Sequence, residues 1–115
     1  MIHNAGLFTT NNIPKSIIQV IVFYSLKQTF TSKFSSLFEA IAKRVRKEEG
    51  CLQYELFVSP YSATRFCLVE KWFSQTNLDK HMGTKHLADF RLQSGPWFEQ
   101  KPLIEIKTIE NERYL

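Results

Sequence analysis

The chain has 115 residues, 43% hydrophobic and 14% aromatic, which is enough for one domain with a filled core and too few for two. Its net charge is +4, but basic residues are interleaved with acids and the aromatics fall at core-like positions, so we expect no nucleic-acid partner. Two cysteines, Cys51 and Cys67, are too few for a disulfide framework and lack metal-ligand spacing, so we expect no metal. Without a charged leader or a long apolar run, we expect no membrane partner and a cytoplasmic location.

The N-terminal part of the chain divides into a polar segment and a strand. Residues 1–15 are rich in turn formers, and we expect them to be a flexible extension to a single domain over residues 16–115. The run from Ile17 to Tyr24 is almost entirely β-branched and aromatic. Such a run is typical of a central strand that is covered on both faces.

A helix is predicted after this strand. Apolar residues recur from Phe30 to Val45 at spacings that place them on one stripe of an α-helix, with lysines and arginines on the other side. Thr29 or Thr31 is the expected cap at its start, and Gly50 is the expected stop.

The stretch from Cys51 to Trp72 has the pattern of a β-hairpin. Residues 51–58 and 65–72 alternate in the manner of strands, and Pro60 lies in the turn between them. A register slip of one residue would move every side chain to the other face of the sheet, so the pairing is an expectation. The expected pairs on one face are Val58 with Phe66, Tyr54 with Glu70, and Leu52 with Trp72.

Two short helices and a last strand complete the chain. The helices are predicted over residues 75–82 and 85–93, with Ser74 and Thr84 as their N-caps. Clean alternation from Leu103 to Ile109 predicts the strand.

The element order is β-α-β-β-α-α-β, which predicts an α+β, ferredoxin-like fold. In this fold a four-stranded antiparallel sheet carries its helices on one face. The other face of the sheet is also apolar here, so two sheets should pack together in a homodimer. The residues expected on that second face are Ile17, Ile21, Phe23, Cys51, Phe57, Cys67 and Val69.

Three ordered motifs carry a family resemblance: Gly50-Cys51-x-x-Tyr54, Glu70-x-Trp72 and His81-x-x-x-x-His86. With their surroundings, over roughly residues 17–108, they resemble the antibiotic biosynthesis monooxygenase (ABM) domain. The resemblance implies a dimeric α+β barrel with one pocket in each subunit, between the sheet and the helices. It also implies a choice of activities, since similar domains include cofactor-independent quinol monooxygenases, an isomerase of a sugar phosphate and haem-degrading enzymes.

The haem-degrading branch is disfavoured by three positions. That branch has an Asn on the first strand, which Ile17 to Tyr24 lacks. His81 stands where the branch has a Trp, and Arg91 stands where it has a His that binds iron. We therefore expect no haem.

The hairpin and the helix after it hold the candidate chemistry. Glu70 alternates with apolar residues, so its carboxyl group should be buried and needs a partner or a raised pKa. His81 follows Leu78 by three residues and should face the sheet, where an imidazole can move a proton near neutral pH. We take His81 as the acid/base and Glu70 as its orienter, with Tyr54 and His86 as polar groups of the pocket. The alternative is that Glu70 and His81 only hold the fold together.

His81 and His86 are five residues apart, so on one helix they would be rotated by about 140° and would not form a metal pair. Aromatic side chains are the expected apolar walls of the pocket, although aromatics at such spacing also build plain core. They are Tyr24, Phe66, Trp72, Phe90 and Trp97.

Cofactor-free oxygenation needs a site that binds a flat ring, removes a proton and excludes water. The chain has no Gly-rich phosphate loop, which argues against a bound flavin or nicotinamide and leaves a diffusing reduced flavin open. We therefore predict a cofactor-independent monooxygenase that acts on a quinol-like or other enolisable small molecule. The alternatives are a non-catalytic small-molecule-binding dimer, and an isomerase of a phosphorylated keto sugar that binds anions near Arg or Lys side chains.

Overall fold

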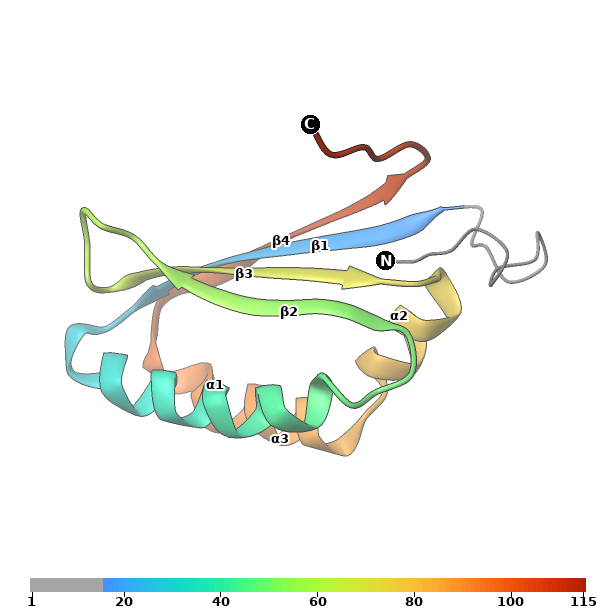
Figure 1. Ribbon diagram of the computed structural model, residues 1–115. Coiled ribbons are helices and arrows are strands. Elements are labelled where there is room, and N and C mark those ends of the chain that lie inside the picture. The colour runs from blue at the N-terminus through green and yellow to red at the C-terminus, as the bar shows by residue number, and fades with distance from the viewer. Residues whose placement is uncertain (1–15) are drawn as a thin grey trace.

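The computed structural model describes residues 16–115, so the predicted extension over residues 1–15 lies outside the described part of the chain. Residues 16–115 form four strands and three α-helices in the predicted order, and Figure 1 shows how they are arranged. The elements are β1 (Ile17–Leu26), α1 (Thr31–Val45), β2 (Cys51–Val58), β3 (Arg65–Trp72), α2 (Gln75–Met82), α3 (Lys85–Ser94) and β4 (Phe98–Ile109). Short 3-10 turns over Gln28–Phe30 and Gly95–Trp97 precede α1 and β4.

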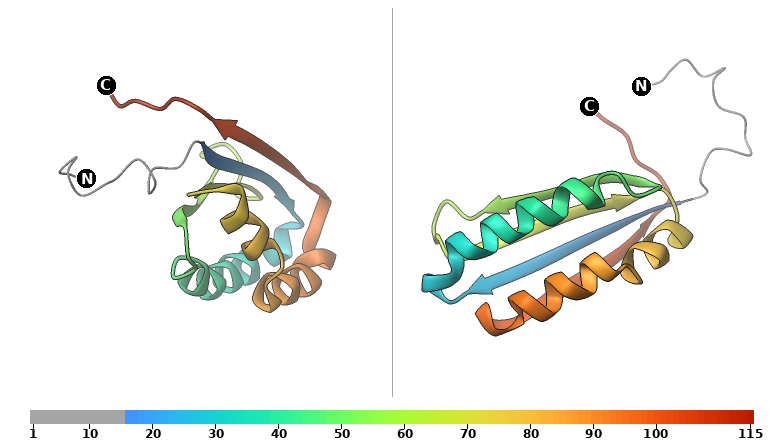
Figure 2. Two further views of the ribbon diagram at one scale, coloured as in Figure 1. Left: turned by 90° about the vertical axis from the view of Figure 1, so that its right-hand side faces the viewer. Right: turned by 90° about the horizontal axis from the view of Figure 1, so that it is seen from below.

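The strands form one antiparallel sheet in the order β2-β3-β1-β4. Helices α1 and α3 lie side by side across one face of the sheet, and α2 packs on β1 and β3 (Figures 1 and 2). The predicted α+β, ferredoxin-like fold is confirmed. None of the helices within residues 16–115 is long and apolar enough to cross a membrane.

The predicted hairpin register is correct over most of its length. Tyr54 lies opposite Glu70 and Val58 opposite Phe66. The expected pairing of Leu52 with Trp72 is wrong, because a bulge between Cys51 and Gln53 places Cys51 opposite Trp72 instead. Leu52 therefore points to solvent, with 51% of its surface exposed.

Because of the same bulge, the expected position of Cys51 on the second face of the sheet is wrong. Its side chain packs against the core under the helices, and not on the second face of the sheet. Cys67 does lie on that second face, because it is paired with Phe57 and Phe23, whose side chains are exposed.

Strand β4 begins at Phe98, five residues before the expected Leu103. The segment from Phe98 to Pro102 shows no alternation, and proline lacks the N–H that a ladder needs. Here β4 is an edge strand, where a proline is tolerated. This added length extends the wall of the cavity described below.

The expected caps of α1 are wrong. Its N-cap is Phe30, which makes no side-chain cap bond, and the Thr31 hydroxyl instead donates back to the Gln28 carbonyl at 3.1 Å. The helix ends at Val45, and tight turns lead from there to Gly50. The predicted N-caps of α2 and α3 are correct: the Ser74 and Thr84 hydroxyls accept from backbone N–H groups of the first turns.

Gly50 does not stop α1, which ends five residues earlier, but is the turn residue immediately before β2. Its φ is +80°, a region that residues with a side chain rarely adopt. A Cβ at this position would overlap the side chain of Asn77, which accepts the Ser74 hydroxyl at 2.7 Å. Gly50 therefore lets the start of α2 pack directly on the turn that follows α1.

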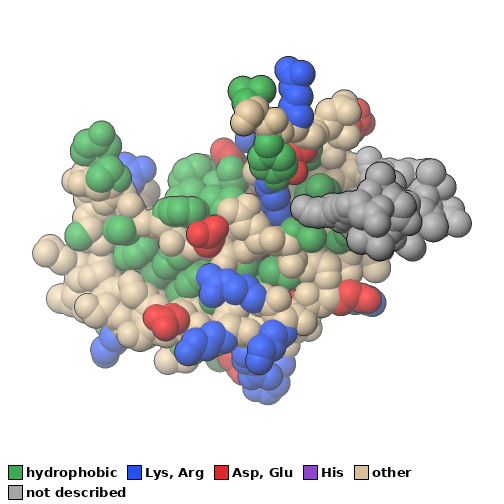
Figure 3. Space-filling view, viewed as in Figure 1, with side chains coloured by type: hydrophobic (Ala, Val, Ile, Leu, Met, Phe, Trp, Pro, Cys, Tyr) green, Lys and Arg blue, Asp and Glu red, His purple; other side chains and the backbone are tan. Residues whose placement is uncertain are grey.

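The second face of the sheet is open and largely apolar. Phe23, Phe57 and Leu103 each have 40% or more of their surface exposed there. Figure 3 shows hydrophobic side chains gathered at the level of the strands, while lysines and arginines gather lower, over α1. Exposed apolar side chains that adjoin one another across paired strands favour a protein interface.

Candidate functional site

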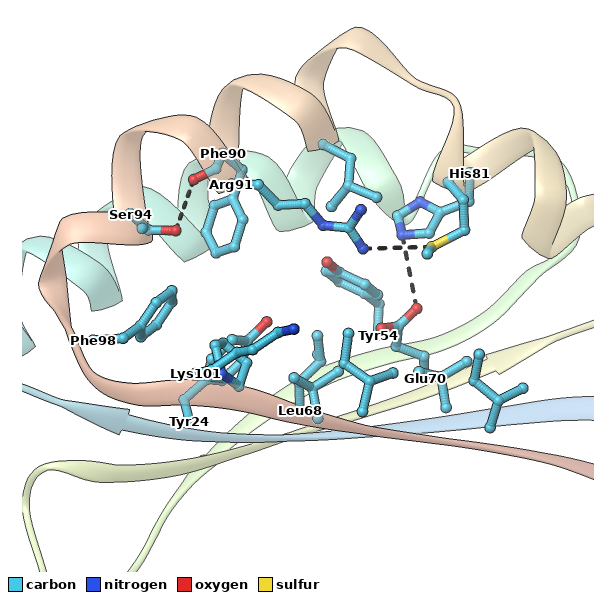
Figure 4. A pocket seen from close by; sticks show the side chains of 18 of the residues that line it. Tyr24, Tyr54, Leu68, Glu70, His81, Phe90, Arg91, Ser94, Phe98 and Lys101 are labelled. Atoms are coloured by element: carbon cyan, nitrogen blue, oxygen red, sulfur yellow. Dashed lines mark hydrogen bonds and ion pairs between the residues drawn. The ribbon is translucent and has the colours of Figure 1, made fainter.

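A cavity of about 590 Å³ lies between the sheet and the helices α2 and α3 (Figure 4). Its floor is formed by side chains of β1 and β3, and one side is formed by β4. Ile104 and Ile106 pair with the buried Val22 and Val20, so they face the helices, yet about half of each is exposed. The cavity exists because no helix covers this part of β4.

Glu70 is the carboxylate of the cavity floor. Strand alternation points it toward the helices, as predicted, and only 5% of its surface is exposed. The indole N–H of Trp72 donates to its Oε1 at 2.9 Å. Burial raises the pKa of Glu70 to about 7, although the Trp72 hydrogen bond and the positive charge of Arg91 oppose the rise. At neutral pH this group therefore exchanges a proton readily.

His81 lies beside Glu70 and is 1% exposed. Its Nε2 is 3.7 Å from Oε1 of Glu70, and its ring stacks on Trp72 with centroids 4.5 Å apart. Its Nδ1 is 3.1 Å from Oε1 of Glu48. Burial lowers the pKa of His81, and Glu48 opposes this effect. A neutral ring that donates from Nδ1 to Glu48 presents the lone pair of Nε2 toward Glu70.

Glu48 was not among the predicted site residues, yet it binds both histidines of the motif. Its Oε2 lies 2.7 Å from Nε2 of His86 and 3.2 Å from Nδ1 of His81. The turns after α1 bring Glu48 back over the start of α3, so a residue from a charged run becomes largely buried. Four groups thus form a row from the cavity floor toward the surface: Glu70, His81, Glu48 and His86.

Two tyrosine hydroxyls complete the polar groups of the floor. Tyr24 and Tyr54 are buried and line the cavity, and Tyr54 also stacks on Phe38. Burial raises the pKa of both phenols, so both are neutral. Neither hydroxyl is hydrogen-bonded to any side chain or backbone group within residues 16–115. Both are therefore available to a bound molecule.

The predicted pocket residues separate into two groups. His81, Glu70, Tyr54, Tyr24 and Phe90 line the cavity. The others do not contribute to its wall, because core packing or another partner holds them elsewhere. Phe66 packs on Phe34, Trp97 stacks on Phe30, Trp72 lies behind His81, and His86 binds Glu48.

Arg91 and Lys101 also line the cavity; the family resemblance placed Arg91 where a haem-binding His would stand, but neither was predicted as a pocket residue. Arg91 is on α3, one residue after the apolar Phe90, and Lys101 is in the part of β4 that lacks alternation. Apart from that resemblance for Arg91, alternation and helix spacing give no signal for either residue. No group of three or more His, Cys, Asp or Glu side chains among residues 16–115 is arranged to hold a metal ion.

Comparison with known proteins places these features in a family. A family model described as antibiotic biosynthesis monooxygenase matches residues 17–92. The chain is 30% identical over 80 residues to "Putative monooxygenase Rv0793" of Mycobacterium tuberculosis, a match that covers 70% of this chain and 78% of that protein. It is 26% identical over 92 residues to "Putative monooxygenase YcnE" of Bacillus subtilis, which covers 80% of this chain and 96% of that protein.

Solved structures agree with the sequence matches. The structure of Rv0793 from Mycobacterium tuberculosis has a TM-score of 0.80 and 25% identity, and the match covers 86% of this chain and all of that one. A "putative antibiotic biosynthesis monooxygenase" from Caulobacter crescentus has a TM-score of 0.77 and 26% identity, with coverages of 84% and 92%. The fold around the cavity is therefore the fold of these proteins.

Proposed function

The chain belongs to the antibiotic biosynthesis monooxygenase family, since the family model spans residues 17–92, and on this premise we propose that it is a monooxygenase of a quinol-like small molecule that needs no bound cofactor. The observation that carries the proposal is the pair of Glu70 and His81 in the wall of an apolar cavity. Both groups are largely buried, and burial favours the neutral form of each. Such a pair can accept a proton near neutral pH without leaving an isolated charge.

The proposed reaction starts with proton removal from a ring hydroxyl of the substrate. His81 accepts the proton through Nε2, and Glu48, rather than Glu70 as expected from the sequence, orients the ring through Nδ1. Glu70 lies next to Nε2 and, when ionised, stabilises the imidazolium that forms. The electron-rich anion then reduces O₂ directly. One oxygen atom enters the ring and the other leaves as water with two hydrogen atoms of the quinol, so the product is a hydroxyquinone. Atoms and electrons balance without a further reductant.

The enzyme acts as a homodimer in this proposal. The open face of the sheet carries exposed apolar side chains from three strands, including Phe23, Phe57 and Leu103. A second copy offers the same patch, which matches the self-complementary contact of a two-fold dimer.

A non-catalytic binding protein is the second candidate, and Glu48 is the observation that favours it. This carboxylate binds both His81 and His86, so the histidines also join α2, α3 and the turn after α1. In that case Glu70 and His81 hold the fold and the cavity binds a ligand without changing it.

Oxygen uptake on a panel of naphthoquinols separates the two candidates. Replacing His81 by Gln should lower turnover by at least about 100-fold, the usual contribution of an acid/base group. His86→Gln is the matched control, since His86 binds the same carboxylate outside the cavity, and it should keep most of the turnover. Equal losses in the two variants, or no oxygen uptake by the unmodified protein, would favour the non-catalytic role.

A further inference from the structure

Two positive charges point into the cavity and lack carboxylate partners. Arg91 from α3 and Lys101 from β4 both line it, and Figure 4 shows both side chains extending over the floor. Within residues 16–115, neither cation lies within ion-pair distance of an acidic group. The one side-chain hydrogen bond of the Arg91 guanidinium to a group within residues 16–115 goes to the thioether of Met82, at 3.6 Å, which is a weak acceptor.

The positive charge of Arg91 influences the pKa values of titratable groups around the cavity floor. Burial raises the pKa of Glu70 and of Tyr24, and the positive charge of Arg91 partly opposes both rises; burial lowers the pKa of His81, and Arg91 adds to that fall. Arg91, Lys101 and the other carboxylate of the wall, Glu99, are all exposed, and Glu99 makes no ion pair with either cation. Both cations therefore lie where the cavity opens to solvent and remain free to meet an anionic ligand.

The rest of the cavity suits a flat ring. Its wall is mainly apolar, and its volume of about 590 Å³ is within the usual range for small-molecule sites. The free hydroxyls of Tyr24 and Tyr54 lie on the floor, where they can bind ring oxygens.

We propose that the ligand of this cavity is an aromatic molecule that carries a carboxylate or phosphate group, and that Arg91 and Lys101 bind this anionic group. The statement about the ring rests on the proposed function, whereas the anion site rests on the two cations alone. Arg91 is the main contributor, because a planar guanidinium binds two oxygens of one anion at once. Lys101 adds a point charge from the opposite wall. Arg91 and Lys101 thereby determine which quinols enter.

The test is calorimetric binding under nitrogen, so that no substrate is oxidised. Two probes differ only in a carboxylate: 1,4-dihydroxy-2-naphthoate and 1,4-dihydroxynaphthalene. The unmodified protein should bind the acid about tenfold more tightly, which corresponds to one charge-assisted contact. Arg91→Gln should bring the two affinities close to each other, and Lys101→Gln should lower the affinity for the acid only by a smaller factor. 1-Naphthyl phosphate is the third probe, and tighter binding of it than of the acid would assign the anion as phosphate.

Lys85→Gln is the control, since Lys85 is an exposed cation on the same helix as Arg91 but is paired with Asp89 and lies outside the cavity. It should leave all affinities unchanged. Equal affinity for the acid and the neutral probe, preference for the acid in an Arg91→Gln Lys101→Gln double variant, or no binding of either probe would overturn the anion site. Oxygen uptake is measured separately: preference for the acid without oxygen uptake removes the oxygenase proposal alone, and uptake without such a preference removes the anion site alone.

Discussion

Replacing Glu70 by Gln should change how the stability of the protein depends on pH. Burial raises the pKa of Glu70 from its ordinary value of 4.5 to about 7. Below pH 4.5 the group is protonated in both the folded and the unfolded chain, so folding does not bury a charge there. Between pH 4.5 and 7 the unfolded chain releases the proton while the folded chain keeps it, so stability falls as pH rises. Above pH 7 both states are ionised and the loss is complete.

The size of this loss follows from the two pKa values. The difference from 4.5 to about 7, at about 1.4 kcal/mol per pH unit, corresponds to roughly 3 kcal/mol. Gln has nearly the same shape and can still accept the Trp72 N–H, but it does not titrate. His81 contributes the opposite trend, because its pKa is lowered, and it does so in both proteins.

Urea unfolding at pH 4.5, 6, 7 and 8 measures the effect as a difference between the two proteins. The free energy of unfolding of the unmodified protein, taken relative to that of the Glu70→Gln variant, should fall by roughly 3 kcal/mol between the lowest and the highest pH. Glu39→Gln, which changes an exposed carboxyl on α1, should show no such trend. A difference that is flat with pH, or that grows in favour of the unmodified protein, would refute the view that Glu70 is held neutral by burial.

Three further variants test neighbouring parts of the structure. Trp72→Phe removes the N–H that lowers the pKa of Glu70, so the pKa should rise above about 7, and the pH of half-maximal oxygen uptake should rise with it. Gly50→Ala places a side chain at positive φ and displaces Asn77, so the free energy of unfolding in urea should fall by about 2–4 kcal/mol. A fall below about 1 kcal/mol would mean that this turn relaxes freely. Val69→Asp places a charge at the centre of the open face, so light scattering should show half the mass of the unmodified protein with an unchanged circular dichroism spectrum; an unchanged mass would exclude this face as the dimer contact.

The hairpin shows what a sequence pattern can predict. Alternation in two strands and the position of the turn containing Pro60 predict the register that places Tyr54 opposite Glu70, and the structure has this pairing. The bulge after Cys51 was missed, since the letters CLQYELFV alternate equally well with or without an extra residue. What decides it is the contact of Cys51 with the core, which is a tertiary effect.

Glu48 shows why part of the candidate site was missed. It lies in the run KRVRKEEG, where a charged residue is usually solvated. The early end of α1 at Val45 turns it toward His81 and His86, which come more than thirty residues later. The two histidines were found because their residue type marks them, and the carboxylate that joins them depends on the path of the turn.

The bulge in β2 places one thiol on each side of the sheet. Cys51 lies under the helices, where burial raises its pKa to about 11, so almost none of it is thiolate at neutral pH. Cys67 lies on the open face, next to Val69 and Phe57, where the second copy would sit. A thiol reagent applied to the native protein therefore reports on the two sides of the sheet: Cys51, which is partly buried, reports on the side under the helices, and Cys67 reports on whether the open face is covered.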